Sequence, residues 1–84
     1  MKTAKDLFEE LGYERRFCDE DIISYQNNKN WRYDKNIDFY LEDKIIESFQ
    51  ITAGGRFELS MTPQELKAIN KQVEELGWLE ELGN

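Results

Sequence analysis

Apolar side chains recur at helical spacing near the start of the chain. They stand at positions i, i+3, i+4 and i+7, namely Ala4, Leu7, Phe8 and Leu11. Thr3 precedes them as a candidate N-cap, and Asp6 follows three residues later, where a capping box places its carboxylate. Because Gly12 then interrupts the pattern, the sequence predicts an amphipathic helix over residues 4–11.

A second helical pattern begins near residue 62, and its start signals are stronger. Thr62 is a candidate N-cap, and Pro63 occupies the first helical position, where its missing N–H costs nothing. Glu65 completes a capping box, and Met61 and Leu66 stand at the two positions of a hydrophobic staple. The expected apolar stripe of this helix comprises Leu66, Ile69, Val73 and Leu76.

Both predicted helices end in one repeated motif, EELGY at 9–13 and EELGW at 74–78. Glycine after a helix adopts a left-handed conformation that other residues resist, and the next residue folds back onto the helix. We therefore expect Tyr13 to pack on Phe8 and Trp78 on Val73. A third copy, EELG at 80–83, either frays or continues the second helix.

Between the helices the apolar period changes to two, which is typical of half-buried strands. The alternation occupies four stretches, around residues 23–26, 31–42, 45–51 and 56–61. NNKN at 27–30 predicts a turn between the first two stretches. Lys35 interrupts the apolar positions of the second stretch, so we expect a bend or bulge at residues 34–36.

The AGG segment sets the expected register of the last two strands. A three-residue loop, Ala53–Gly54–Gly55, would pair Ile51 with Phe57 and Phe49 with Leu59, which places all four apolar side chains on one face. A similar loop over residues 42–44 would pair Leu41 with Ile45. In this register Glu47 is an inner-face carboxylate beside Phe39 and Phe49, unless the register shifts by one residue or Glu47 lies at the sheet rim.

These elements predict one α+β domain spanning residues 1–84. Its order is helix, four antiparallel strands in a meander, helix, and the two helices cover the apolar face of the sheet in a two-layer arrangement. A chain of 84 residues can bury only a thin core, so each large side chain contributes strongly to stability.

Composition narrows the function classes. The net charge is −7, which disfavours general nucleic-acid affinity and favours solubility or a basic partner. The chain has no histidine, the commonest general base, so we expect no enzyme, cofactor or small-molecule substrate. A single cysteine, no apolar run near 18 residues and no secretory signal at the start predict a cytoplasmic location without a membrane span.

The only cysteine and the acidic residues that follow it have a structural role as their simplest interpretation. Cys18 follows Arg15 and Arg16 but has no imidazole partner, so we expect a small side chain near a helix–strand junction. The carboxylates at 19–21 lack the ligand number and glycine spacing of a calcium loop, which predicts a solvated turn and no metal site.

Two aromatic groupings are candidates for binding. Trp31, Arg32 and Tyr33 combine rings with a cation, as single-stranded nucleic-acid binders do, although strand alternation should send Arg32 to the face opposite the rings. The tail offers Trp78, Leu79 and Leu82 as an interaction patch for a homodimer, and packing within the monomer is the alternative.

Three stretches carry a resemblance to known proteins. LFEELGYE at 7–14, IDFYL at 37–41 and MTPQELKAINKQVEELGWLEEL at 61–82 resemble small uncharacterised proteins carried by phages and prophages of Gram-positive bacteria. The resemblance implies an intracellular, phage-related setting. It assigns no role to any residue.

The sequence therefore favours a non-enzymatic, acidic protein-interaction or adaptor module whose protein partner is unknown. One alternative is an inhibitor that mimics nucleic acid and occupies a basic groove on a host DNA- or RNA-processing protein. The other is a weak binder of single-stranded nucleic acid through residues 31–33.

Overall fold

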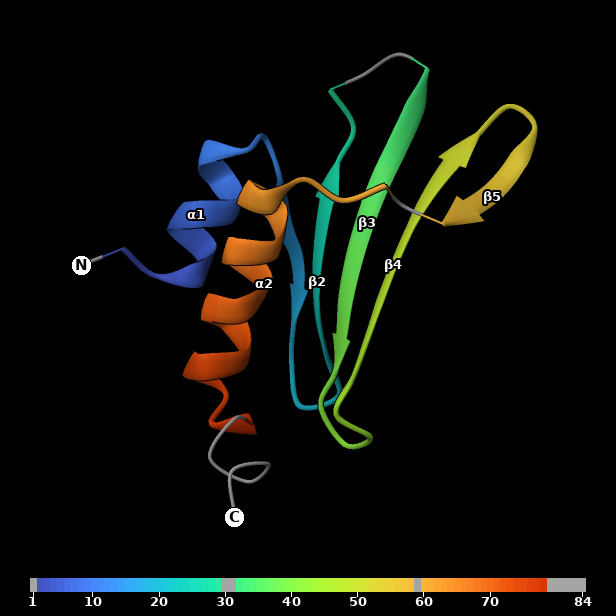
Figure 1. The fold of residues 1–84 in the computed structure, drawn as a ribbon. Helices are drawn as coiled ribbons and strands as arrows, with labels where there is room; N and C mark the ends of the chain where they lie inside the picture. Colours follow the sequence, from blue (N-terminus) through green and yellow to red (C-terminus); the bar gives the residue numbers. More distant parts are fainter. Residues whose placement is uncertain (1, 30–31, 59, 79–84) are drawn as a thin grey trace.

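A computed structural model describes residues 2–29, 32–58 and 60–78 and shows an α+β fold (Figure 1). A helix stands at each end of the described chain, with a sheet between them, as predicted. The elements are α1 (Ala4–Glu10), β1 (Glu14–Cys18), β2 (Ile22–Asn27), β3 (Tyr33–Tyr40), β4 (Ile45–Thr52), β5 (Gly55–Glu58) and α2 (Pro63–Glu75).

The sheet is an antiparallel meander of five strands in the order β1-β2-β3-β4-β5. The prediction of four strands was one short, because β1 reads ERRFC and lacks a clean alternation. Its pairing with β2 shifts between Arg15 and Phe17, which hides the period of two. In the described segments, neither helix combines the length and apolar character that a bilayer span requires.

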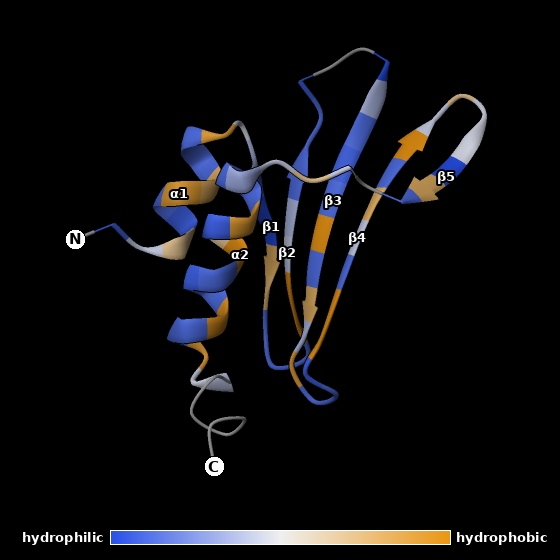
Figure 2. Ribbon diagram, in the orientation of Figure 1, coloured by the Kyte–Doolittle hydropathy of each residue, from blue (hydrophilic) through white to orange (hydrophobic). Residues whose placement is uncertain are grey.

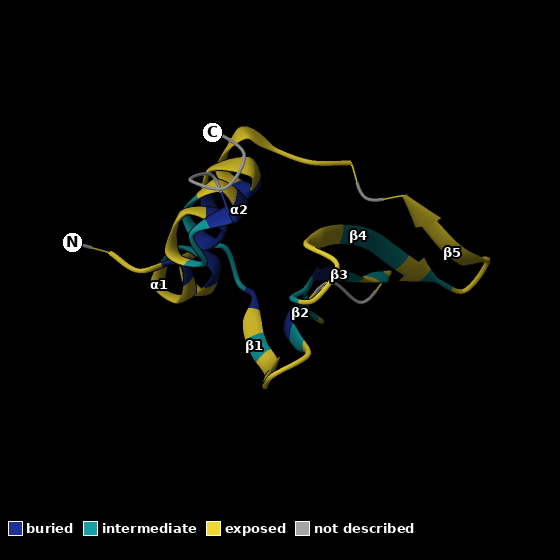
Figure 3. Ribbon diagram, turned by 90° about the horizontal axis from the view of Figure 1, so that it is seen from below, coloured by how far each residue is buried: buried dark blue, intermediate teal, exposed yellow. Residues whose placement is uncertain are grey.

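Both helices pack side by side on one face of the sheet (Figures 1 and 3). The core between these layers is aromatic. The Phe8 ring stacks on Tyr25 with centroids 3.9 Å apart, and Phe39 meets both rings edge-on. The remaining buried apolar residues around this cluster are Tyr13, Ile23, Ile37, Ala68, Ile69, Val73 and Trp78.

The helix starts form as their sequences predict. The Thr3 hydroxyl accepts from the Asp6 backbone N–H at 3.2 Å, and the Asp6 carboxylate accepts from the Thr3 N–H at 3.0 Å. Thr62 and Glu65 make the same reciprocal pair at 3.1 and 2.9 Å. These contacts satisfy backbone donors that the first turn of a helix leaves unpaired.

The glycine stops also form. Gly12 has φ +95° and Gly77 has φ +76°. The Tyr13 N–H donates to the Phe8 carbonyl at 2.9 Å, and the two rings meet edge-on at 5.6 Å. Trp78 is buried in the same core as Val73, and its ring lies 6.4 Å from that of Phe39.

The buried face of α2 differs from the predicted stripe. Leu66 is 51% exposed and Met61 is 38% exposed, so both ends of the predicted staple face largely into solvent. Ile69 and Val73 are buried as predicted, and Leu76 packs partly buried against the core. The other buried positions of the helix are Glu65, Ala68 and Gln72. The helix is rotated relative to its apolar stripe because Glu65 and Gln72 hydrogen-bond to tyrosines of the core.

The predicted register of β4 and β5 was wrong. The turn between β3 and β4 spans residues 41–44, with Lys44 at φ +56°, and it pairs Tyr40 with Ile45. The next loop is Ala53–Gly54, so Phe49 faces Glu58 and Gln50 faces Phe57. Since a slip of one residue inverts every side chain, Phe49 and Phe57 lie on opposite faces of the sheet.

No bulge occurs where Lys35 predicted one. Tyr33–Tyr40 pairs without a break with β4, and its pairing with β2 is equally regular. Lys35 keeps its place on the helix-side face because Glu65 of α2 supplies a partner for its ammonium group there. The one shift in pairing among the described strands lies in β1.

Gly77→Ala should destabilise the fold, because it forces a side chain into a left-handed backbone. Among the described residues, no atom outside the two adjacent positions lies within 4 Å of the added methyl group, so the effect isolates the backbone cost, about 1 kcal/mol. Gly54→Ala is the matched control: its φ lies outside the left-handed region and its added carbon makes ordinary contacts at 3.7 Å. Urea unfolding followed by circular dichroism measures both, and equal midpoints for the two variants would contradict the account.

Candidate interaction surface

One buried polar cluster joins α2 to the sheet and to the loop after α1. Glu65 is only 3% exposed, and its carboxylate accepts a hydrogen bond from the Tyr13 hydroxyl. The Thr62 backbone N–H donates to the same carboxylate at 2.9 Å, and the Lys35 ammonium lies 3.5 Å from it. A buried carboxylate of this kind is stabilised only because each of its oxygens has a partner.

The electrostatics of this cluster indicate an anchor. Burial, together with the carboxylate that it faces, raises the pKa of Tyr13 far above its ordinary value. Burial also raises the pKa of Glu65, but the Tyr13 hydroxyl, the Thr62 backbone and Lys35 outweigh that effect and hold it below its ordinary value. A group kept ionised in this way ties elements together and is poorly suited to proton transfer near neutral pH.

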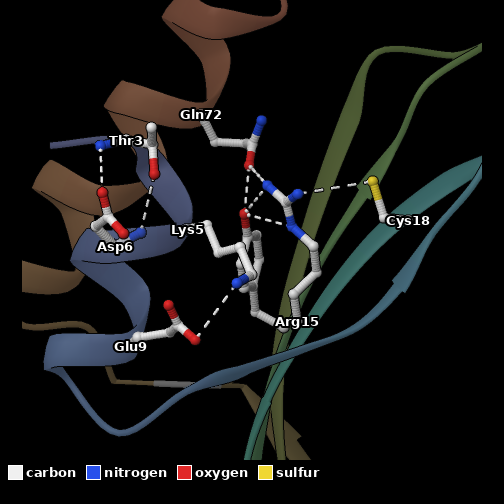
Figure 4. Close-up of polar contacts among 8 residues, drawn as sticks. Thr3, Lys5, Asp6, Glu9, Arg15, Cys18 and Gln72 are labelled. Atoms are coloured by element: carbon white, nitrogen blue, oxygen red, sulfur yellow. Dashed lines mark hydrogen bonds and ion pairs between the residues drawn. The ribbon is translucent and has the colours of Figure 1, made fainter.

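A second cluster joins β1 and β2 to α2. The Tyr25 hydroxyl donates to the Gln72 side-chain oxygen at 2.5 Å, and the Arg15 Nη2 donates to that hydroxyl at 2.7 Å. Figure 4 shows Arg15 between Gln72 and the Cys18 sulfur, which lies 3.8 Å from Arg15 Nη1. Burial raises the pKa of Tyr25, although Arg15 opposes that effect. The described side chains contain no buried polar atom without a partner, so both clusters are saturated.

The helices leave part of the sheet uncovered. We call residues 45–58, the hairpin of β4 and β5, the wing. It extends away from the helices (Figure 1), and β5 and the ends of β4 are exposed in Figure 3. Four large apolar side chains of the wing are strongly exposed: Ile45 at 53%, Ile46 at 39%, Ile51 at 45% and Phe57 at 50%. Figure 2 shows these apolar segments on a hairpin that no helix covers.

The pairing assigns these side chains to both faces of the wing. Ile46 is opposite the buried Phe39, and Phe57 is opposite Gln50, so both lie on the helix side. Ile45 and Ile51 lie one and five residues from Ile46 along β4. Because strand side chains alternate between faces, both lie on the helix-free side. The wing therefore presents apolar surface in two directions.

Glu47 lies on the helix-free side, which corrects its predicted place beside Phe39. It pairs with Asp38 of β3, and its carboxylate forms an ion pair with Arg56. The Arg56 guanidinium also lies over the Phe49 ring, 3.7 Å from its centroid. The inner-face position rested on three-residue turns, and the structure instead shows the alternative, a register shifted by one residue. In the observed register Glu47 is a half-exposed, paired side chain of the wing.

The predicted tail patch divides between described and undescribed residues. Trp78 is 7% exposed and packs against Phe39. For this residue, packing within the monomer, the alternative to a homodimer patch, is what the structure shows. Leu79 and Leu82 lie outside the described residues. Among the described residues, the candidate for an interaction surface is the wing, at the opposite edge of the sheet from β1.

The predicted nucleic-acid residues are only partly described. Trp31 lies outside the described residues, and Arg32 is exposed. Tyr33 is half-buried, with the Lys35 ammonium 5.7 Å from its ring centroid. A hollow of about 280 Å³ beside them is lined by Asn27, Lys29, Tyr33 and Lys35.

The carboxylates after Cys18 form a turn. Asp19 accepts from the backbone N–H groups of Asp21 and Ile22 at 2.8 and 3.0 Å. Cys18 itself is exposed at the end of β1. Within the described part of the chain, no three acidic or thiol side chains are grouped so that they could hold a metal ion.

One sequence signal could have revealed the wing. Ile45 and Ile46 are adjacent, and a strand cannot bury two neighbouring side chains on one face. One of them must face away from the helices whatever the register. The sequence did not show that the helices would leave both faces uncovered there.

Comparisons with protein-family models, with curated proteins and with solved structures find no match to this chain.

Glu65→Gln should flatten the dependence of stability on pH. Since the folded-state pKa of Glu65 lies below its unfolded value near 4.5, its contribution is present above that value and is lost as pH falls through the folded pKa. We expect the free energy of unfolding of the wild type to exceed that of the variant by about 1–3 kcal/mol at pH 7 and by much less at pH 3. Urea unfolding across this range measures the difference.

Glu74→Gln is the matched control, because Glu74 is an exposed carboxylate of the same helix. It should follow the wild-type pH dependence closely. A Glu65→Gln variant with the wild-type slope would show that the buried carboxylate does not titrate with folding.

Proposed function

We propose that this chain is a non-enzymatic protein-interaction module and that the wing is its contact surface. One observation carries the proposal: four of the seven exposed large apolar side chains of the described chain, at residues 45, 46, 51 and 57, lie on a hairpin beside the helices. Exposed apolar surface of this kind is a common feature of interaction sites, because its burial releases ordered water.

The shape and charge of the wing indicate what it would contact. Its helix-free face combines the apolar Ile45, Phe49 and Ile51 with the charged pair of Glu47 and Arg56. Arginine and aromatic side chains are enriched at protein interfaces, and here Arg56 lies over the Phe49 ring. The partner that fits is a protein presenting an extended apolar segment. The intracellular, phage-related setting implied by the sequence resemblance belongs to the same proposal.

The saturated clusters support a non-enzymatic role. Three buried ionisable groups, Tyr13, Glu65 and Tyr25, have partners that hold them away from proton transfer near neutral pH. Tyr13 joins the loop after α1 to α2, whereas Glu65 and Tyr25 join α2 to the sheet. Stability accounts for their arrangement, which leaves the wing as the feature that stability does not explain.

The wing predicts a variant-dependent loss of binding. An Ile51→Ser/Phe57→Ser protein changes two exposed side chains and should fold with little loss of stability. Met61→Ser/Leu66→Ser is the matched control, since it removes two exposed apolar side chains outside the wing. Affinity capture from bacterial lysate should retain a specific protein with the wild type and the control, and lose it with the wing variant.

That protein, once purified, should bind the wild type at least tenfold more tightly than the wing variant in a titration by calorimetry, a difference of about 1.4 kcal/mol. A purified partner that binds both proteins equally would overturn the proposal, as would a capture profile that the wing variant leaves unchanged.

The basic hollow favours single-stranded nucleic-acid binding as a second candidate. Lys29, Tyr33 and Lys35 place two cations and a ring around one hollow in an otherwise acidic chain. A labelled oligonucleotide titrated at low salt should then show a rise in anisotropy. Lys29→Glu should weaken this binding and reduce its salt slope by about 0.7, whereas Lys67→Glu on α2 should not. An unchanged anisotropy with the wild type would eliminate this candidate.

A further inference from the structure

The two edges of the sheet are built differently. At one edge, β1 contacts α1, and its pairing with β2 is irregular between Arg15 and Phe17. At the other edge, β5 pairs regularly with β4 along its whole length, and all four of its residues are exposed. Irregular edges resist the addition of a strand, whereas a regular open edge offers a template for one.

The turn before β5 determines which backbone groups face outward. Thr52 and Gly55 flank a two-residue loop, so they form a hydrogen-bonded pair. Hydrogen-bonded pairs alternate along an antiparallel ladder, which makes Gln50 and Phe57 the next one. The backbone N–H and C=O groups of Arg56 and Glu58 must therefore point away from β4, toward the open edge.

The side chains at these two positions carry opposite charges. A second strand with the same sequence can approach antiparallel, around a two-fold axis, only in registers that bring outward-facing groups together. An axis through position 56 would place arginine against arginine, and an axis through position 58 would place glutamate against glutamate. An axis through Phe57 places Arg56 against Glu58 on both sides of the axis.

We propose that β5 pairs with β5 of a second copy of this chain, antiparallel and centred on Phe57. Each Arg56–Glu58 pair then exchanges both of its backbone hydrogen bonds and brings opposite charges together on the helix-free face. The two Phe57 rings meet on the helix side, in a non-hydrogen-bonded pair, where side chains lie closest. The two sheets become one continuous sheet, joined at the β5 edge of each copy.

Contacts within the monomer prepare this arrangement. Arg56 is already stacked on Phe49 and paired with Glu47, so little side-chain freedom remains to be lost on association. The edge is also locally neutral, although each chain carries a net charge of −7. Repulsion between the copies is screened at physiological ionic strength, where charges interact over about 8 Å. A strand this short gives a small interface, so the dimer should be weak and dependent on concentration.

This inference rests on the proposed contact surface, and charge exchange tests it separately. Sedimentation velocity at about 0.15 M salt and concentrations up to about 1 mM should show a monomer–dimer equilibrium for the wild type. Arg56→Glu and Glu58→Arg each place like charges across the axis, and each should weaken the dimer about tenfold. An equimolar mixture of the two variants restores opposite charges and should form a heterodimer as tight as the wild-type dimer.

The mixture excludes a trivial loss of folding, because a misfolded variant would not recover in it. Circular dichroism of each variant alone provides the second check. A wild type that remains monomeric at the highest concentration would overturn the inference, as would a dimer that both single variants retain. Neither charge variant removes the apolar side chains of the wing, so a monomeric wild type with wing-dependent capture would leave the proposed function standing.

Discussion

The Tyr25 side chain is the contact on which the arrangement of layers depends. Its ring stacks on Phe8 of α1, and its hydroxyl donates to Gln72 of α2 and accepts from Arg15 of β1. One residue of a central strand thus holds both helices and the neighbouring strand. Both helices lie over the strands around Tyr25, and their Phe8 and Gln72 side chains give its ring a stacking partner and its buried hydroxyl an acceptor.

The position of the helices leaves the edge of the sheet opposite β1 without helical cover. β4 and β5 extend beyond the cover, so apolar side chains that a larger domain would bury remain in water. The two described helices lie over the part of the five-stranded sheet nearest β1 and β2 and leave β4 and β5 beside them. The wing is the part of the sheet that the helices leave uncovered. Its regular edge and paired charges give this surface a specific geometry, which a uniformly apolar patch would lack.

The polar clusters show why α2 packs in its observed rotation. Hydrophobicity alone would direct Leu66 inward, yet Glu65 is buried and Leu66 is exposed. The capping box holds the Glu65 carboxylate against the Thr62 backbone, and Tyr13 and Lys35 approach it from the core side. Burial of a carboxylate with this many partners competes successfully with burial of one leucine, since the partners would otherwise be left unpaired.

Local signals in the sequence were sufficient for the helices and their ends. Caps and glycine stops depend on residues within a few positions of one another, so Thr3, Thr62, Gly12 and Gly77 act as predicted. Period-two alternation likewise identified β2, β3, β4 and β5, and missed only β1 among the described strands. The candidate site was harder to predict from the sequence. The faces of Glu47 and Phe49 were inferred from turn lengths, and both turns differ from those expected.

By itself, then, the sequence determined the element types, the helix termini and the α+β class, because short-range sterics and hydrogen bonds decide them. Only the tertiary structure decided the strand register, the buried face of α2 and the extent of helical cover. Register and cover depend on contacts between residues far apart in the chain, such as Lys35 with Glu65, and one residue of slip in a turn is enough to invert a strand. The wing exists because of those long-range choices.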